Sequence, residues 1–218
     1  PGNSLYIKSF EMVLESKFNA SVKAKKTFFS KSLSTDINRN CEGLIVVGIL
    51  RTPEDRFKNL FNYNFKSNYI QITDPDLGKL RMHYLDEGSH FSKVALLLHG
   101  QPTWSYLYRE MIPILVKNGI RVIAPDLIGF GKSDKPSSRA SYTYNGHVDW
   151  LNKFFLKLKL KNVTLFGQDW GGLIGLRLLC DNQDAFDAVM IGNTALPTGD
   201  HDLGEPFKAW REFTQTNE

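Results

Sequence analysis

The chain has 218 residues, of which 42% are hydrophobic and 12% aromatic, the composition of a folded domain with a sizeable core and not of a disordered chain. Its net charge of +4 is confined to residues 1–40, which hold seven Lys or Arg against three Asp or Glu, while the other 178 residues hold 20 of each sign. An electrically neutral body argues against a nucleic-acid-binding protein and suits a small uncharged substrate.

Two cysteines, Cys41 and Cys180, lie far apart in the sequence and provide neither a disulfide framework nor the spacing of a metal site. The longest apolar run, residues 43–50, is far shorter than the roughly 20 residues of a membrane-spanning helix. No signal peptide is recognisable. We therefore expect a cytoplasmic protein that needs no metal or cofactor and does not span a membrane.

Residues 1–45 are rich in Ser, Lys and Asn and show no periodicity, so we expect a poorly ordered basic extension there. Beyond it, short apolar runs alternate with helical patterns, which predicts an α/β fold with a mostly parallel sheet. The expected strands are residues 67–73, 79–86, 94–98, 121–125, 163–166 and 188–192, and the expected helices are the residues that follow Arg109 up to Lys117, residues 143–158 and residues 173–180. The glycine-rich loop of residues 126–133 lacks the spacing of a phosphate-binding loop and is interpreted as structural.

The stretch from Asn162 to Gly172 organises the rest of the chain and reads NVTLFGQDWGG. A short apolar strand leads into a glycine-flanked turn, and helical spacing follows. This is the strand–turn–helix pattern of a nucleophile elbow, which usually reads G-x-S-x-G. Here the central position is Asp169, which such a turn would expose at the carboxyl end of a strand, where ligands bind in open α/β sheets.

A carboxylate at this position changes the expected chemistry. Unlike serine, Asp169 is already anionic at neutral pH and can attack an sp³ carbon directly to form an ester with the enzyme. Suitable targets carry a leaving group, such as a carbon–halogen bond or an epoxide. The alternative interpretation is that Asp169 is an ordinary turn residue that caps the following helix.

Three motifs in this order and spacing resemble the haloalkane dehalogenases of the α/β-hydrolase fold. They are HGQPTWSYLYR at residues 99–109, PDLIGFGKSDKP at residues 125–136 and GQDWGG at residues 167–172. The resemblance runs from about Ile49 to the C-terminus. It implies hydrolysis of a small halogenated hydrocarbon by water to an alcohol and a halide, with Asp169 as the nucleophile.

The resemblance also implies roles for three further residues. Trp170 would donate its indole N–H to the leaving halide, and the backbone N–H groups of Gln101 and Trp170 would form the oxyanion hole. Gln101 favours the subfamily that takes its second halide donor from a cap-domain tryptophan. The candidate for that donor is Trp210, although a tryptophan on an amphipathic helix is often a core residue.

The family also uses a His base and an orienting acid after the nucleophile, in that chain order. The strand of residues 188–192 is followed by Asn193, which is not acidic, and the only later histidine is His201, where the family has no base. We therefore expect the N-terminal portion of such an enzyme, truncated at the start of its cap: an extension at residues 1–45, a partial hydrolase core at 46–193 and the start of a cap at 194–218. Such a chain would stop at the ester and would leave its last strand as an uncovered apolar edge.

Two alternatives stay open. Epoxide hydrolases share the H-G-x-P turn and an Asp–Trp elbow, although Gln101 and the Gln168 before the nucleophile favour dehalogenation. The second alternative is a non-catalytic, truncated remnant or binding protein.

Overall fold

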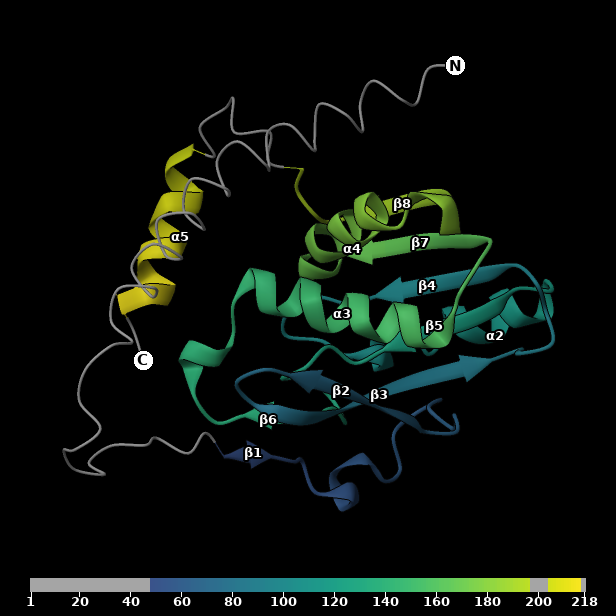
Figure 1. Cartoon of the computed structure of the whole chain (residues 1–218), viewed down its shortest axis with the longest axis horizontal. Helices are drawn as coiled ribbons and strands as arrows, with labels where there is room; N and C mark the ends of the chain where they lie inside the picture. Colours follow the sequence, from purple (N-terminus) through teal and green to yellow (C-terminus); the bar gives the residue numbers. More distant parts are fainter. Residues whose placement is uncertain (1–47, 197–203, 217–218) are drawn as a thin grey trace, which may run out of the picture. The chain divides into compact units, whose positions relative to one another are not determined.

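The computed structural model describes residues 48–196 and 204–216, and a six-stranded sheet in the order β2-β3-β5-β4-β7-β8 forms the centre of the first range (Figure 1). A separate pair of two-residue strands, β1 and β6, lies beside it. The strands are β1 Ile49–Leu50, β2 Asn68–Asp74, β3 Gly78–Glu87, β4 Val94–Leu98, β5 Arg121–Pro125, β6 Lys135–Pro136, β7 Val163–Gln168 and β8 Phe186–Gly192.

Four α-helices and four 3₁₀ helices accompany these strands in the described residues. The α-helices are α2 Met111–Lys117, α3 Tyr144–Leu158, α4 Trp170–Asp181 and α5 Gly204–Thr216, and the 3₁₀ helices are η1 Glu54–Phe57, η2 Ser105–Tyr108, η3 Arg139–Ser141 and η4 Gln183–Ala185. None of the described helices is both long and apolar enough to cross a membrane.

The sheet is mixed in a simple way. Strands β5, β4, β7 and β8 run parallel to one another, while β2 and β3 form an antiparallel hairpin that joins the sheet through β3 and β5. The predicted strands 94–98 and 121–125 coincide with β4 and β5. The predicted α/β class, with a mostly parallel sheet flanked by helices, is confirmed.

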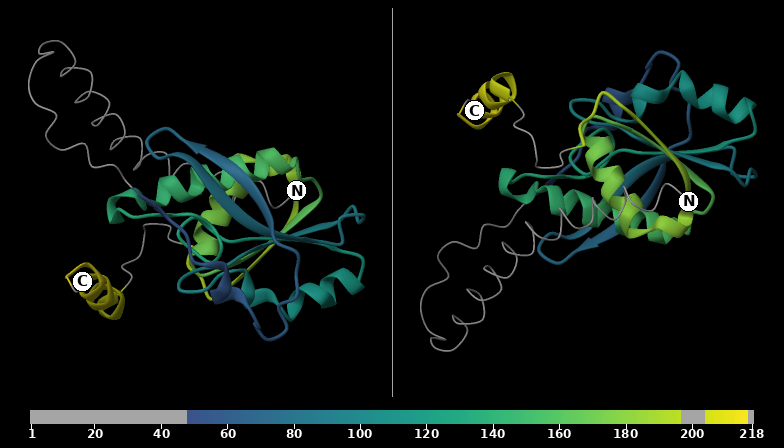
Figure 2. Two further views of the ribbon diagram at one scale, coloured as in Figure 1. Left: turned by 90° about the horizontal axis from the view of Figure 1, so that it is seen from below. Right: turned by 90° about the horizontal axis from the view of Figure 1, so that it is seen from above.

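Helices cover both faces of this sheet (Figure 2). On one face α3 and α4 pack over a cluster that contains Leu96, Leu98 and Leu165, and on the other face α2 packs over a cluster that contains Ala95 and Leu97. The alternating residues of β4 therefore enter two different cores. Strands that are buried on both faces read as continuous apolar runs, as the sequence of β4 does.

The capping residues and the spacing of the buried residues explain why the sequence of α3 forms a helix. Thr143 caps α3 by accepting a hydrogen bond from the Gly146 N–H at 3.0 Å, and Lys159 ends the helix in a left-handed conformation. Its buried residues recur at helical spacing and are Trp150, Leu151, Phe154 and Phe155.

The order of the strands determines where a ligand can bind. The chain leaves β4 through α2 to reach β5 on one side, and it leaves β7 through α4 to reach β8 on the other side. The carboxyl ends of β4 and β7 therefore border a topological switch point, the usual ligand site of an open α/β sheet. Asp169 directly follows β7, and Gln101 lies in the loop after β4.

The described residues fall into two units, one of residues 48–195 and one that contains residues 196 and 204–216. The second unit includes α5, whose exposed aromatic residues are Phe207, Trp210 and Phe213. The predicted basic extension at residues 1–45 lies outside the described residues. The domain limits 46–193 and 194–218 stay predictions.

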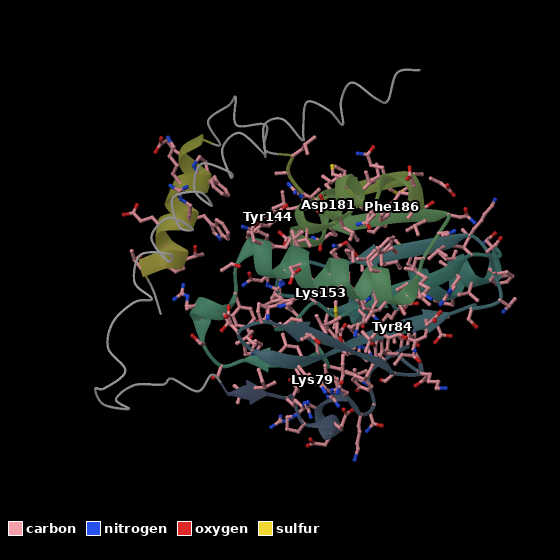
Figure 3. All side chains as sticks on the ribbon, viewed as in Figure 1. Lys79, Tyr84, Tyr144, Lys153, Asp181 and Phe186 are labelled. Carbon is pink, nitrogen blue, oxygen red and sulfur yellow. The ribbon has the colours of Figure 1, made fainter. Side chains whose placement is uncertain are left out.

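The two edges of the sheet differ. At the β2 edge, the ammonium group of Lys153 on α3, which is labelled in Figure 3, donates to the Thr73 carbonyl at 2.9 Å. The ammonium group of Lys157, also on α3, donates to the Gln71 carbonyl at 2.6 Å. At the other edge, the middle of β8 is exposed on both faces, with Val189 at 48%, Met190 at 60% and Ile191 at 43% exposure. Within the described residues, β8 is thus the uncovered apolar edge that the sequence predicts.

An uncovered apolar edge strand should pair with a second copy of the chain. We predict that the chain self-associates at micromolar concentration and that Met190→Lys weakens the association about tenfold or more, because a charge must then be buried. Analytical ultracentrifugation measures the dissociation constant. Leu156→Lys, at an equally exposed apolar position on α3, is the matched control and should leave it unchanged; equal weakening by both variants would contradict the prediction.

A second prediction concerns the bond between α3 and the β2–β3 turn. The buried Trp150 indole N–H donates to Asp74 Oδ2 at 2.7 Å. Burial alone would raise the pKa of Asp74, but hydrogen bonds from Trp150 and from the turn backbone outweigh it and lower the pKa. Trp150→Phe should lower the free energy of unfolding by about 1–3 kcal/mol near neutral pH.

Because the folded-state pKa of Asp74 is depressed, this stabilisation is present above the unfolded-state pKa of about 4 and is lost as the pH falls through the folded-state value. Urea unfolding near neutral pH and at about pH 3 should therefore show a smaller difference between wild type and Trp150→Phe in acid. Asp76→Asn, which removes a charge from the same turn without touching the indole, is the control. A difference that is equal at both pH values would refute this account of the bond.

Candidate active site

Asp169 occupies the sharp turn between β7 and α4. Its backbone has φ 53° and ψ −124°, a left-handed φ that is strained for a residue other than glycine. Asp169 stands at the N-cap position of α4, yet its side chain makes no capping hydrogen bond. The carboxylate is therefore available for another purpose, which argues against the interpretation of Asp169 as an ordinary helix cap.

Two glycines make room for this turn. A Cβ at Gly171 would collide with the backbone carbonyls of Leu98 and His99, so the start of α4 can lie against the end of β4 only without a side chain there. A Cβ at Gly100 would likewise collide with the Asp169 side chain. The carboxylate thus lies directly against the backbone of the loop after β4.

The closest partner of the carboxylate is the backbone of that loop. The Gln101 N–H donates to Asp169 Oδ1 at 2.8 Å. The backbone of Asp169 is held separately, because its N–H donates to the Asn193 carbonyl at 3.1 Å and its carbonyl accepts from the Thr194 hydroxyl at 2.7 Å. Oδ1 thus accepts a hydrogen bond from a neutral N–H, and the bonds that hold the backbone of Asp169 do not use Oδ2.

Trp170 is the first residue of α4, and its side chain is 38% exposed. It is therefore not a buried core residue. As the first helical residue, its backbone N–H is among the four that an α-helix leaves without an intrahelical acceptor. Gln101, Asp169 and Trp170 thus lie together at the carboxyl ends of β4 and β7, as the sequence predicts.

His99 is close to Asp169 but cannot serve as its base. The ring is fully buried, Nδ1 donates to the Gly100 carbonyl at 2.9 Å and Nε2 accepts from the Leu127 N–H at 3.0 Å. Burial lowers the pKa of His99, and both hydrogen bonds belong to the neutral ring. His201, the only histidine after the nucleophile, lies outside the described residues.

Trp210 lies on α5 and is 54% exposed, with its ring centroid 5.6 Å from that of Phe207. It belongs to the second structural unit. Its role as second halide donor stays a prediction.

The sequence did not identify Asn193, Thr194 or His99 as parts of the site. Asn193 stands out there only because it is not acidic, and His99 only as the first residue of a motif. Each of the three makes a hydrogen bond with a backbone group that lies just beyond the end of a different strand. The register of the sheet brings these groups together. The available signal was positional, since each follows the carboxyl end of an expected parallel strand. Among the described residues, no group of three or more His, Cys, Asp or Glu could hold a metal ion.

Comparison with known proteins agrees with this geometry. A curated haloalkane dehalogenase of Psychrobacter cryohalolentis is 59% identical over 167 residues, which is 77% of this chain and 55% of the relative. A haloalkane dehalogenase of Mycobacterium marinum is 49% identical over 77% of this chain and 56% of its own length. The chain thus spans about half the length of the curated relatives it matches.

Among solved structures, the haloalkane dehalogenase of Paraglaciecola agarilytica, described as tetrameric, superposes with a TM-score of 0.72 at 42% identity, covering 78% of this chain and 56% of that one. The resemblance to haloalkane dehalogenases inferred from the three motifs is confirmed. Residues 94–217 match the family described as the alpha/beta hydrolase fold. The chain belongs to this family.

Proposed function

We propose that this chain carries the nucleophilic part of a haloalkane dehalogenase site, with a small halogenated hydrocarbon and water as the reactants. The observation that carries the proposal is a carboxylate at a strained elbow, free of any capping role and held at Oδ1 by the Gln101 N–H. The similarity to haloalkane dehalogenases supports the same assignment. A cytoplasmic location stays a prediction.

In the proposed reaction, Asp169 Oδ2 attacks the carbon that bears the halogen. A carbon–oxygen bond forms, the carbon–halogen bond breaks, and the halide leaves with the electron pair. The Trp170 indole N–H stabilises the departing anion, with Trp210 as the proposed second donor. Asp169 Oδ1 becomes the carbonyl oxygen of the ester, and the N–H groups of Gln101 and Trp170 are the proposed oxyanion hole when water cleaves it.

Cleavage of the ester needs a base that activates water. Among the described residues, His99 lies near Asp169, but both of its ring nitrogens are already engaged. We therefore propose that this chain forms the ester and does not hydrolyse it.

The experiment is to incubate the chain with 1-bromobutane and to measure released bromide and protein mass. We predict about one bromide per chain and a stable increase in mass by one butyl group, located on Asp169 by peptide mapping. Asp169→Asn should form no adduct, because an amide is not a nucleophile under these conditions.

An adduct on Asp169→Asn would contradict the role of Asp169, and repeated bromide release without an adduct would contradict the arrest at the ester. The same experiment with 1,2-epoxybutane tests the epoxide hydrolase alternative, which a faster adduct with the epoxide than with the bromoalkane would favour. If neither reagent labels Asp169, the non-catalytic alternative is the better account.

A further prediction concerns the halide. Trp170→Phe removes the indole N–H but keeps an aromatic ring, so ester formation should slow by about 10- to 100-fold, the loss of one charge-assisted hydrogen bond. Quenched-flow measurement of bromide release gives the rate. Trp210→Phe should slow the same step only if α5 contributes the second donor, and an unchanged rate with Trp170→Phe would rule out the assigned donor.

A further inference from the structure

The segment that presents the Gln101 N–H is anchored at both ends to one neighbouring segment, the residues that follow β5. At its start, His99 Nε2 accepts a hydrogen bond from the Leu127 N–H at 3.0 Å. At its end, the Ser105 N–H donates to Asp126 Oδ1 at 2.9 Å. Residues 100–104 therefore span two fixed points, and Gln101 lies between them.

Asp126 is the stronger of these anchors. It is fully buried, and its Oδ2 accepts hydrogen bonds from His83 Nδ1 and from the Lys132 N–H, both at 2.8 Å. Its backbone N–H also donates to the His83 carbonyl at 2.9 Å. One buried carboxylate thus accepts three hydrogen bonds, from His83, Ser105 and Lys132, which lie in three different segments. Moving any of these segments would leave a buried charge without one of its hydrogen-bond donors, which is costly.

The charge of this carboxylate strengthens the anchor. Burial opposes ionisation, but the hydrogen bond from His83 and the neighbouring imidazoles outweigh it and hold the pKa of Asp126 below its ordinary value. Asp126 is thus ionised at neutral pH, and its bond to the Ser105 N–H is charge-assisted, a class roughly twice as strong as neutral hydrogen bonds.

The Ser105 side chain has a separate task. Its hydroxyl lies 2.7 Å from the Tyr63 hydroxyl, in a buried pair. Because the hydroxyl is engaged elsewhere, the link between the Gln101 segment and Asp126 is the backbone N–H alone. Ser105→Ala therefore removes the hydroxyl pair alone, and the difference between Ser105→Ala and Ser105→Pro isolates the backbone N–H.

We propose that Asp126 is a positioning residue for the nucleophile: through the Ser105 N–H it fixes the loop that holds the Gln101 N–H against Asp169 Oδ1. Asp126 touches neither Asp169 nor the substrate in this scheme, and it acts only through the loop. The proposal deepens the proposed function and rests on it for the identity of the reaction.

The decisive variant is Ser105→Pro, which removes the N–H. Ser105 is the first residue of η2, where a proline costs no intrahelical hydrogen bond, and Trp104 before it is extended, with φ −156° and ψ −172°. The proline ring also places its Cδ against Asp126 Oδ1, so the variant breaks this link by repulsion as well as by loss of the donor. Ser105→Ala is the matched control, since it loses only the hydroxyl pair with Tyr63. Asp126→Asn is the second variant, because its amide cannot accept all three hydrogen bonds.

We expect Ser105→Pro and Asp126→Asn to lower the saturating rate of Asp169 alkylation by 1-bromobutane about tenfold or more relative to Ser105→Ala, the usual effect of a misplaced reacting group. The half-saturating concentration should stay the same, because contacts to the alkyl chain are unchanged. The second readout is hydrogen exchange of the Gln101 amide by NMR, which should be protected in wild type and in Ser105→Ala and unprotected in the other two variants.

The two proposals fail in different ways. If wild type forms no ester, the proposed function fails, and the Gln101 amide still tests the positioning role. If Ser105→Pro matches Ser105→Ala in rate and in amide protection, the positioning role is overturned. If Ser105→Pro and Asp126→Asn lose their fold by circular dichroism, Asp126 supports the whole fold and not this loop in particular, and the positioning role is overturned.

Discussion

The hydrogen bond from the Gln101 N–H to Asp169 Oδ1 joins the loops after β4 and β7, and the geometry of the candidate site depends on it. It can form only because the backbones meet without side chains between them, at Gly100 against the carboxylate and at Gly171 against the carbonyls that end β4. A methyl group at either position would separate the two loops. The Asp169 side chain would then lose the donor that orients it.

The sheet fixes the positions of the two loops that the bond from Gln101 to Asp169 joins. Leu96 and Leu98 of β4 enter one core, and Ala95 and Leu97 enter the other, so that packing on both faces fixes the strand against translation and rotation. Its parallel register with β7 pairs Leu98 with Gly167, two residues before the elbow. The ends of these neighbouring strands thus lie side by side before any residue of the site makes a contact.

Local patterns predicted the elements that local physics controls. The strand at 94–98 is a continuous apolar run, the strand at 121–125 is apolar after Arg121, and the limits of both agree with β4 and β5. The strand expected from Ala188 begins at Phe186 in β8, where Phe186 pairs with Val163 of β7 and its ring stacks on Phe155 of α3 at 5.1 Å. That contact is tertiary, and no window of sequence around residue 186 contains it.

The same distinction holds for the helix after the elbow and for the site. The helix begins at Trp170 and not at Leu173, since close packing against the end of β4 holds a Gly-Gly pair in helical conformation that by itself favours a turn. Motifs identified Asp169, Gln101 and Trp170 as candidates because those residues lie within short patterns of defined spacing. The pair of Ser105 with Asp126 joins residues 21 positions apart, so only the topology reveals it.

The strained backbone of Asp169 explains how a residue that is consumed in a reaction can also form a stable turn. A left-handed φ costs about 1–3 kcal/mol at a residue other than glycine. Here the Asn193 carbonyl, the Thr194 hydroxyl and the Gly172 N–H all bind the backbone of Asp169, and each such bond contributes about 1 kcal/mol. None of them uses the carboxylate. Esterification of Asp169 would therefore leave the turn intact, with Oδ1 still able to accept the Gln101 N–H as an ester carbonyl.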